Sequence, residues 1–252
     1  MPKKILAIEI STGAVRFSKL DGSFVVSKKE HVFADKQDYR YNQQLTDFMA
    51  ENQLKEIDFD ECSVSWSGKQ STIVPTNVFN ESSANTLFNL CFGDTYSTSE
   101  IDYNRVADPN VVNVHHLPFW VKSFFVLKFP RVVIQHEGTY LLRGIFKNAT
   151  FKLKATLVMH EDYFQLIIVK ENNLQFYSSF DFSSLEDIIY YLSFTLQQKE
   201  WTKAPIDIVL TNGAGGNVSL EELTEKLTKI LGKEAKIVSE EYLLANYQEL
   251  CV

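Results

Sequence analysis

The apolar residues of this chain fall into short continuous runs and longer helical stripes, which together predict an α/β protein. A strand that is covered on both faces carries few polar residues, so continuous apolar runs indicate buried strands. Such strands are expected at 4–10, 61–66, 151–159 and 206–211. Apolar residues that recur every three or four positions predict helices at 38–54, 183–198 and 220–231.

Turn residues divide the start of each half of the chain in the same way. Ser11-Thr12-Gly13 separates the strand 4–10 from a second strand at 14–20, and the hairpin signal Asp21-Gly22 precedes a third strand at 23–29. In the second half, His160-Glu161-Asp162 and Glu171-Asn172-Asn173 separate strands at 151–159, 163–169 and 174–180. Both halves therefore begin with a three-stranded meander.

The region from 67 to 148 is less regular. A helix capped by Thr76 or Asn77 is expected to carry Val78, Phe79, Leu87 and Phe88, with a polar stretch at 80–85 that could interrupt it. Residues 93–108 are rich in polar and turn-forming residues and predict a loop. The remaining elements expected here are strands at 111–116 and 131–135, a helix opened by Pro118, and a helix at 138–148.

The helices of the second half carry start signals. Ser183 with Glu186, and Ser219 with Glu222, match the capping-box spacing at helix N-termini. A last strand is expected at 235–238. The order β-β-β-α-β-α-β then occurs twice, which predicts two domains of one topology at 1–149 and 150–252.

Composition limits the classes of partner. Of the 252 residues, 45% are hydrophobic and 23% are charged, which is typical of a globular protein with a substantial core. The net charge of −7 argues against a nucleic acid partner, and no apolar run is long enough to span a membrane. Cys62, Cys91 and Cys251 are dispersed and favour a reducing, cytoplasmic location.

A glycine-rich turn joins the strand 206–211 to the helix at 220. Asn212, Gly213, Gly215 and Gly216 lie where backbone amides could approach an anion or a nucleotide. The spacing is neither that of the dinucleotide fingerprint nor that of a P-loop. The alternative is a tight turn whose glycines adopt positive φ.

The first turn offers a second candidate for phosphate binding. Glu9 ends an apolar strand, and Ser11, Thr12 and Gly13 follow. Hydroxyls and a glycine amide could face an anion while the Glu9 carboxylate holds Mg²⁺ through water. A solvated turn is the alternative. The pair His115-His116 is a poor metal site, because adjacent strand residues point to opposite faces.

The duplicated order, with turns at 11–13, 160–162 and 212–216, resembles the actin-like ATPase fold, which consists of two ribonuclease-H-like domains. That superfamily includes actin, heat-shock chaperones, sugar and acetate kinases, and bacterial pilus-assembly and cell-division homologues of actin. The chain is most similar to an uncharacterised bacterial family of about this length, and Val111 to Phe146 looks like the crossover between the two domains. The resemblance implies ATP and Mg²⁺ as cofactors.

The chain departs from the superfamily pattern at both phosphate hairpins. The first is usually Asp-x-Gly followed by Thr or Ser, whereas this chain has Glu9-Ile10-Ser11-Thr12-Gly13. The second hairpin, 159–163, has no glycine. The turn 212–216, which corresponds to the adenosine side, is the best preserved. The resemblance identifies no catalytic residue.

Three functions follow from these observations. The first is a nucleotide-binding or degenerate ATPase, weak or inactive, that acts through an unknown protein partner, with a homodimer left open. The second is an active Mg-ATP-dependent ATPase or small-molecule kinase, in which Glu161 and Asp162 are the only acidic pair that the topology places. The third is a scaffold whose cleft is filled by its own side chains, for which His160 and Tyr163 are bulky enough.

Overall fold

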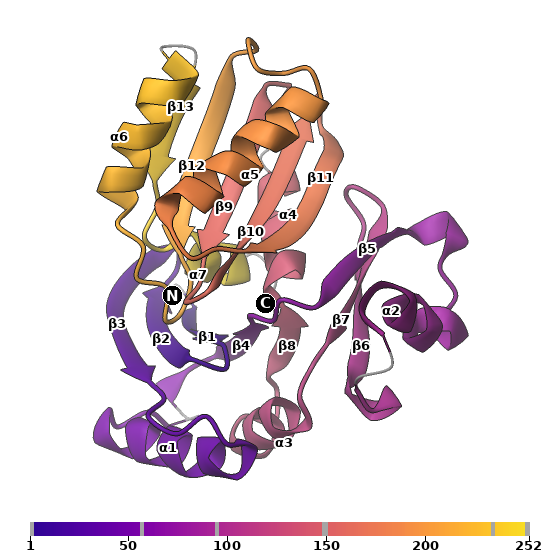
Figure 1. Ribbon diagram of the computed structural model, residues 1–252. Coiled ribbons are helices and arrows are strands. Elements are labelled where there is room, and N and C mark those ends of the chain that lie inside the picture. Colours follow the sequence, from indigo (N-terminus) through magenta and orange to yellow (C-terminus); the bar gives the residue numbers. More distant parts are fainter. Residues whose placement is uncertain (1–2, 56–57, 94–95, 148–150, 233–234, 250–252) are drawn as a thin grey trace. The chain divides into compact units, whose positions relative to one another are not determined.

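The chain forms two compact units in the computed structural model, Met1–Lys147 with Tyr242–Val252, and Asn148–Glu241 (Figure 1). The structure describes residues 3–55, 58–93, 96–147, 151–232 and 235–249. Cys251 and the expected boundary between 149 and 150 lie outside the described residues. The segment from Tyr242 belongs to the first unit, whereas the sequence analysis placed it in the second domain.

The main sheet of the first unit has the strand order β3-β2-β1-β4-β8. Its strands are β1 (Lys4–Ile10), β2 (Ala14–Asp21), β3 (Phe24–Val32), β4 (Glu61–Trp66) and β8 (Val133–His136). The meander β1-β2-β3 is antiparallel, and β4 and β8 run parallel to β1. The carboxyl ends of β1, β4 and β8 therefore meet at one edge of the sheet.

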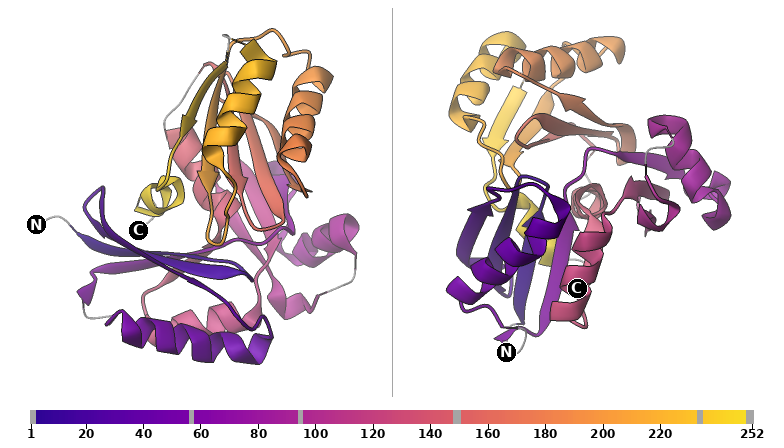
Figure 2. Two further views of the ribbon diagram at one scale, coloured as in Figure 1. Left: turned by 60° about the vertical axis from the view of Figure 1, so that its left-hand side comes forward. Right: turned by 60° about the horizontal axis from the view of Figure 1, so that its bottom comes forward.

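The side-chain alternation of β1 assigns each sheet face to different helices. Leu6, Ile8 and Ile10 enter the core beneath α1 (Asp38–Glu51) and α3 (Phe119–Lys128). Ile5 and Ala7 point to the opposite face and pack with Ala245 of α7 (Leu243–Glu249). Figure 2 shows α1 on one side of this sheet and α7 on the other.

Helix α7 was missed by the sequence analysis, and its position depends on contacts distant in sequence. It packs on α4 (Glu137–Lys147), where Gly144 lies directly against the Tyr247 ring. A Cβ at Gly144 would come within 2.1 Å of the Tyr247 Cγ. The side chain of Gln248 is buried, and its Nε2 donates to the carbonyl oxygens of Ile8 and Ser63 at 3.1 Å.

A small antiparallel sheet is inserted between β4 and α3, with the order β5-β7-β6. Its strands are β5 (Ser71–Pro75), β6 (Ile101–Val106) and β7 (Val111–His116), and α2 (Ala84–Phe92) packs on them. The prediction that 93–108 is a loop was wrong, because the segment contains β6. The strand was hidden because Asp102, Asn104 and Arg105 give it a polar sequence.

The helix expected from Thr76 or Asn77 begins only at Ala84. Two 3₁₀ turns, Thr76–Val78 and Glu81–Ser83, precede it. The Oδ1 of Asn80 accepts a hydrogen bond from the Ser82 amide at 3.0 Å, which gives the backbone a local alternative to the α-helix.

The second unit repeats the first sheet with the order β11-β10-β9-β12-β13. Its strands are β9 (Leu153–Met159), β10 (Tyr163–Lys170), β11 (Asn173–Asp181), β12 (Ile206–Asn212) and β13 (Ala235–Ser239). Helices α5 (Leu185–Gln198) and α6 (Leu220–Leu231) contribute Ile188, Leu192, Leu223 and Leu227 to the core of this unit. The repeated strand order confirms the predicted fold class.

The capping box of α5 lies one residue later than predicted. Ser184, not Ser183, is the N-cap, and the Asp187 carboxylate accepts hydrogen bonds from the amides of Ser183 and Ser184 at 2.8 and 2.9 Å. These bonds lower the pKa of Asp187. At α6 the Ser219 hydroxyl accepts from the Glu222 amide, as predicted. None of the helices in the described ranges is long and apolar enough to cross a membrane.

Candidate functional site

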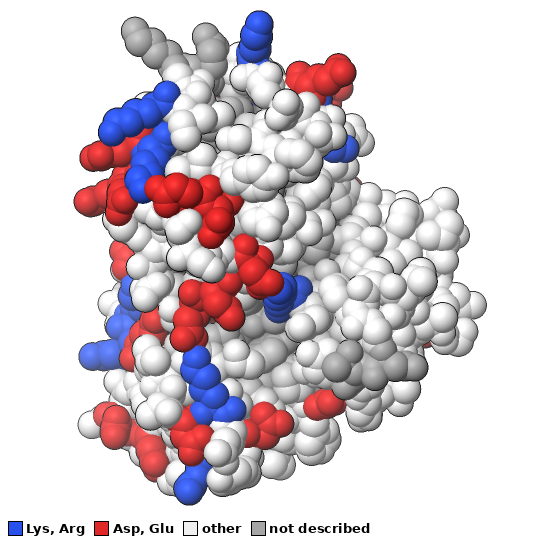
Figure 3. Space-filling view, viewed as in Figure 1, with Lys and Arg blue, Asp and Glu red and all other residues white. Residues whose placement is uncertain are grey.

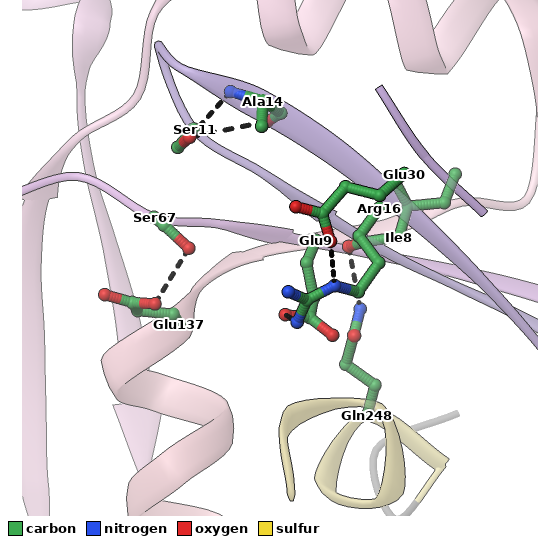
Figure 4. A network of polar contacts seen from close by, with 9 residues as sticks. All are labelled: Ile8, Glu9, Ser11, Ala14, Arg16, Glu30, Ser67, Glu137 and Gln248. Carbon is green, nitrogen blue, oxygen red and sulfur yellow. Dashed lines mark hydrogen bonds and ion pairs between the residues drawn. The ribbon is translucent and has the colours of Figure 1, made fainter. Parts of the chain in front are cut away.

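The turn between β1 and β2 is closed by its own serine. The Oγ of Ser11 accepts hydrogen bonds from the amides of Gly13 and Ala14, both at 3.1 Å, and the Ser11 amide donates to the Ala14 carbonyl at 2.9 Å (Figure 4). The Gly13 amide, which was expected to face an anion, is thus engaged within the turn. Ser11 and Gly13 are buried, whereas Thr12 is exposed.

The Thr12 backbone is also held from outside the turn. Tyr41 of α1 donates its hydroxyl to the Thr12 carbonyl at 2.9 Å. Burial, helped by the nearby carboxylates of Asp38 and Asp35, raises the pKa of Tyr41 to about 12, so the hydroxyl keeps its proton. Hydrogen bonds from within the turn and from Tyr41 therefore hold the first candidate phosphate loop in a compact conformation.

Glu9 lies on the sheet face that α7 covers, where it forms an ion pair. Its Oε2 is 3.0 Å from Nη1 of Arg16, which is its direct partner across the β1–β2 pair. Arg16 also donates from Nε to Glu30 at 2.6 Å. Glu9 is only 2% exposed, and Figure 4 shows the three side chains gathered beside Gln248 of α7.

This environment does not suit the predicted Mg²⁺ ligand. The guanidinium already neutralises the Glu9 carboxylate, and a fixed positive charge at hydrogen-bond distance repels a divalent cation. The sequence analysis missed this pairing. The turn expected at 11–13 would place residue 9 opposite residue 15, whereas the structure pairs Glu9 with Arg16, and the two carry opposite charges.

A second buried acid, which the sequence analysis missed, lies at the same edge of the sheet as the first turn. Glu137 follows β8 and begins α4, and its Oε2 accepts a hydrogen bond from the hydroxyl of Ser67, which follows β4, at 2.8 Å. Both side chains are buried. Ligands of open α/β sheets bind beyond the carboxyl ends of parallel strands, so this pair occupies a chemically relevant place.

The signal for Glu137 in the sequence is an acidic residue directly after a short strand and at the start of a helix. Glu9 differs, because it lies within β1 before a hairpin. His136 beside Glu137 is fixed by its own hydrogen bonds, because its Nδ1 accepts from the Gly138 amide at 3.0 Å and its Nε2 lies 2.7 Å from the Gly68 carbonyl. The imidazole therefore carries its proton on Nε2, which donates to Gly68.

The glycine-rich turn after β12 packs against the β9–β10 hairpin within the second unit. The Gly213 amide donates to the Met159 carbonyl at 2.9 Å, and the Gly216 amide donates to the Gly213 carbonyl at 2.9 Å. Asn212 donates from Nδ2 to the Val218 carbonyl at 2.9 Å. Gly215 has φ of 80°, which favours glycine.

The imidazole of His160 lies directly on Gly213. A Cβ at Gly213 would come within 2.4 Å of the His160 Cε1, and the ring stacks on Tyr163 with a centroid distance of 4.4 Å. At Gly216 a Cβ would come within 2.3 Å of the Met159 carbonyl oxygen. The glycines thus accommodate close contacts inside the unit, and the His160 ring lies where a side chain at position 213 would be.

The predicted site residues form two local groups. Glu9, Ser11, Thr12 and Gly13 lie on one hairpin of the first unit, and Asn212, Gly213, Gly215 and Gly216 lie on one turn of the second. Glu161 and Asp162 are exposed at the β9–β10 turn. The Glu9 carboxylate and the Gly13 amide are engaged by protein groups, and the assignment of the two groups to Mg²⁺ and a nucleotide stays a prediction.

Two units with the same five-stranded order define this protein as one with an actin-like ATPase fold. The chain belongs to the family described as "Protein of unknown function (DUF3822)", whose model matches residues 1–230. A search of curated proteins found no match.

Two solved structures illustrate the fold. One is a protein from Bacteroides thetaiotaomicron VPI-5482 with an actin-like ATPase fold and unknown function. It is 20% identical to this chain with a TM-score of 0.77, and the match covers 100% of this chain and 97% of the other. The other is the PilM-PilN type IV pilus biogenesis complex, which is 11% identical with a TM-score of 0.62 and covers 98% of each chain. At these identities the likeness shows the fold alone.

Proposed function

We propose that this chain is a degenerate member of the actin-like fold that acts through contacts with other proteins and does not turn over a nucleotide. The observation that carries the proposal is the His160 ring against Gly213. A nucleotide needs close access to a glycine backbone, and here a buried side chain of the same unit takes that access. The third function considered from the sequence, a scaffold filled by its own side chains, agrees with this arrangement.

The first hairpin supports the proposal independently. Phosphoryl transfer depends on positioned amide donors and metal ions that stabilise charge. The Ser11 hydroxyl accepts hydrogen bonds from the amides of Gly13 and Ala14. Arg16 forms an ion pair with the Glu9 carboxylate, which was expected to hold Mg²⁺. In each of the two groups of predicted residues, a local protein contact therefore supports the proposal that a nucleotide is not turned over.

Binding to other proteins is the mode of action that we propose. The PilM-PilN structure is described as a complex, so a protein of this fold engages a protein partner in that case. The acidic net charge argues against nucleic acid, and the dispersed cysteines support a cytoplasmic location. We therefore place the protein among assembly or regulatory components.

The test is a thermal-shift titration of the full chain with Mg-ATP, Mg-ADP and GTP. A ligand at about 100 times its Kd would stabilise the fold by about 2.7 kcal/mol. We expect no shift at millimolar nucleotide. A saturable shift that depends on Mg²⁺ would overturn the proposal.

Two variants show whether the local contacts are the cause. His160→Gly removes the ring from Gly213, and Ser11→Gly releases the amides of the first turn. We expect nucleotide binding to be absent in each single variant and to appear only when both changes are combined. Binding by the His160→Gly variant alone would contradict the role given to Ser11.

The alternative is an active Mg-ATP-dependent ATPase or small-molecule kinase, and the specific observation that favours it is Glu137. A buried carboxylate held by Ser67 at the carboxyl edge of parallel strands is suited to act as a base. Phosphate release by the wild type that is abolished by Glu137→Gln and retained by Glu161→Gln would establish this alternative. No release from the wild type would exclude it.

A further inference from the structure

Helix α5 exposes two aromatic side chains on its outward side, Tyr190 and Phe194, and helix α6 exposes one aliphatic side chain, Ile230. Between the two helices runs a groove of about 450 Å³, lined by Glu186, Ile189, Tyr190, Lys226, Lys229 and Ile230. Tyr190 is 59% exposed, Phe194 45% and Ile230 58%. The inward stripes already fill the core, so these outward side chains are not needed to hold the helices on the sheet. We call the outward surface the α5–α6 face.

The two helices run in the same direction. Each connects strands that are parallel to one another, since α5 leads from β11 to β12 and α6 from β12 to β13 (Figure 1). The Nζ of Lys226 is 2.6 Å from Glu186, which places these residues at the same level along the groove. Tyr190 and Ile230, each four residues further on, therefore share the next level.

Charged and apolar side chains occupy different parts of the α5–α6 face. Figure 3 shows acidic side chains near the N-terminal ends of the two helices, basic side chains further along α6, and a largely uncharged surface over α5. Lys226 bonds both Glu186 and Glu222. Lys229 has no ion-pair partner within the described ranges and adds a positive charge beside Tyr190 and Ile230.

We propose that the α5–α6 face is a contact between two copies of this chain, related by a two-fold axis that runs along the groove. Such an axis lays α5 of each copy on α6 of the other at the same level. Tyr190 then covers Ile230 of the second copy, and Lys229 reaches the Glu186 carboxylate of the second copy. The pairing occurs twice, as an isologous interface requires.

A second copy fits better than a different protein because the α5–α6 face carries both members of each complementary pair. Its α5 side offers an aromatic ring and a carboxylate, and its α6 side offers an aliphatic side chain and a lysine. Helix α5 has 14 residues and is about 21 Å long. A contact area limited to two helices of that length from each copy is small. We therefore expect a concentration-dependent dimer with a Kd in the micromolar range.

The experiment is sedimentation velocity of the full chain from about 1 to about 200 µM, a range that covers weak interfaces. The wild type is expected to rise from one-chain to two-chain mass. Ile230→Glu should raise the dimer Kd at least about tenfold, because it places a carboxylate in the apolar contact. Leu90→Glu is the matched control, since Leu90 is an exposed leucine of α2 in the first unit.

The charge pairing has its own test. Lys229→Glu should weaken the dimer severalfold, whereas Lys199→Glu, which makes the same charge change at the end of α5, should leave it unchanged. A wild type that stays a monomer at the highest concentration would overturn the proposal. Equal effects of Ile230→Glu and Leu90→Glu, or of the two lysine changes, would also overturn it.

Discussion

The two units have the same strand order, yet each closes its hairpin with different chemistry. In the first unit a serine hydroxyl binds the amides of the turn between β1 and β2. In the second unit the turn between β9 and β10 carries a histidine whose ring lies on Gly213. The strand order depends on buried apolar faces, whereas the hairpin chemistry depends on single side chains, so the fold persists while the site changes.

The sheet faces differ as well. In the first unit, the face under α7 carries buried polar side chains, namely Glu9, Arg16, Ser18, Ser63 and Ser65. The other face of this sheet, toward α1 and α3, is apolar, as is the face of the second sheet toward α5 and α6. Removal of one partner from a buried polar pair leaves the other group without compensation, so substitutions at Glu9 and Arg16 are expected to destabilise the first unit. The following predictions test this difference.

The largest effect is expected at Glu9. Glu9→Ala removes a carboxylate from the buried Arg16, and removal of one partner of a buried ion pair costs about 3 kcal/mol of the free energy of unfolding. Urea unfolding, followed by the fluorescence of Trp66 and Trp120 in the first unit, measures the loss.

Two variants serve as controls for Glu9. Glu30→Ala should cost less, because Glu30 is partly exposed. Glu9→Leu combined with Arg16→Met removes both charges and should cost less than Glu9→Ala. A loss below about 1 kcal/mol in Glu9→Ala would contradict a structural ion pair, since exposed pairs contribute that little.

Acid should destabilise the first unit through His115. Burial lowers the pKa of His115 to about 3, so between pH 6.5 and pH 3 the unfolded chain binds a proton that the folded chain does not. Stability is full above pH 6.5 and falls by about 1.4 kcal/mol per pH unit below it. Urea unfolding at pH 7 and pH 5 should therefore differ by about 2 kcal/mol from this residue alone.

His115→Gln isolates that contribution because glutamine gains no charge in acid. The variant should lose most of the difference between pH 7 and pH 5. His116→Gln is the matched control, since burial lowers the pKa of His116 while Glu100 acts in the opposite direction. An unchanged pH slope in His115→Gln would show that other groups cause the acid response.

The sequence was sufficient for the strands of both main sheets. The apolar runs at 4–10, 61–66 and 206–211 are buried on both faces, so their pattern needs no knowledge of the partner elements. β6 was missed because its polar residues bond to distant groups, as when Asn104 accepts from Thr139 at 3.1 Å. Helix α7 depends on Gly144 and on the polar sheet face, which come from other parts of the chain.

The turns that carry the predicted site residues were found, whereas the ligand role of those residues stays a prediction. The turns at 11–13 and 212–216 exist where expected, because serine, threonine and glycine specify turns locally. The contact of His160 with Gly213 depends on the parallel pairing of Asn212 with Met159, which joins segments over 50 residues apart. Local sequence signals do not encode such a contact, so a glycine turn alone did not reveal what lies on it.

In the second unit the corresponding test is Gly213→Ala. The new Cβ would lie 2.4 Å from a buried ring stacked on Tyr163, and such overpacking costs roughly 1–2 kcal/mol. The same substitution made together with His160→Ala should cost little. Gly216→Ala is the control, because its clash is with the Met159 backbone and His160→Ala should not relieve it. Absence of rescue at Gly213 would refute the assigned contact.

The smallest effect is expected at the first hairpin. Ser11→Ala removes the acceptor of two turn amides, which is comparable to the loss of a helix N-cap and should cost about 1 kcal/mol. Thr12→Ala is the matched control and should be nearly neutral, because the Thr12 side chain is exposed and only its carbonyl is bonded. Amide hydrogen exchange should accelerate at Gly13 and Ala14 in Ser11→Ala and not in Thr12→Ala. If both variants exchange like the wild type, the hydroxyl does not hold the turn, and the two hairpins differ less than their sequences indicate.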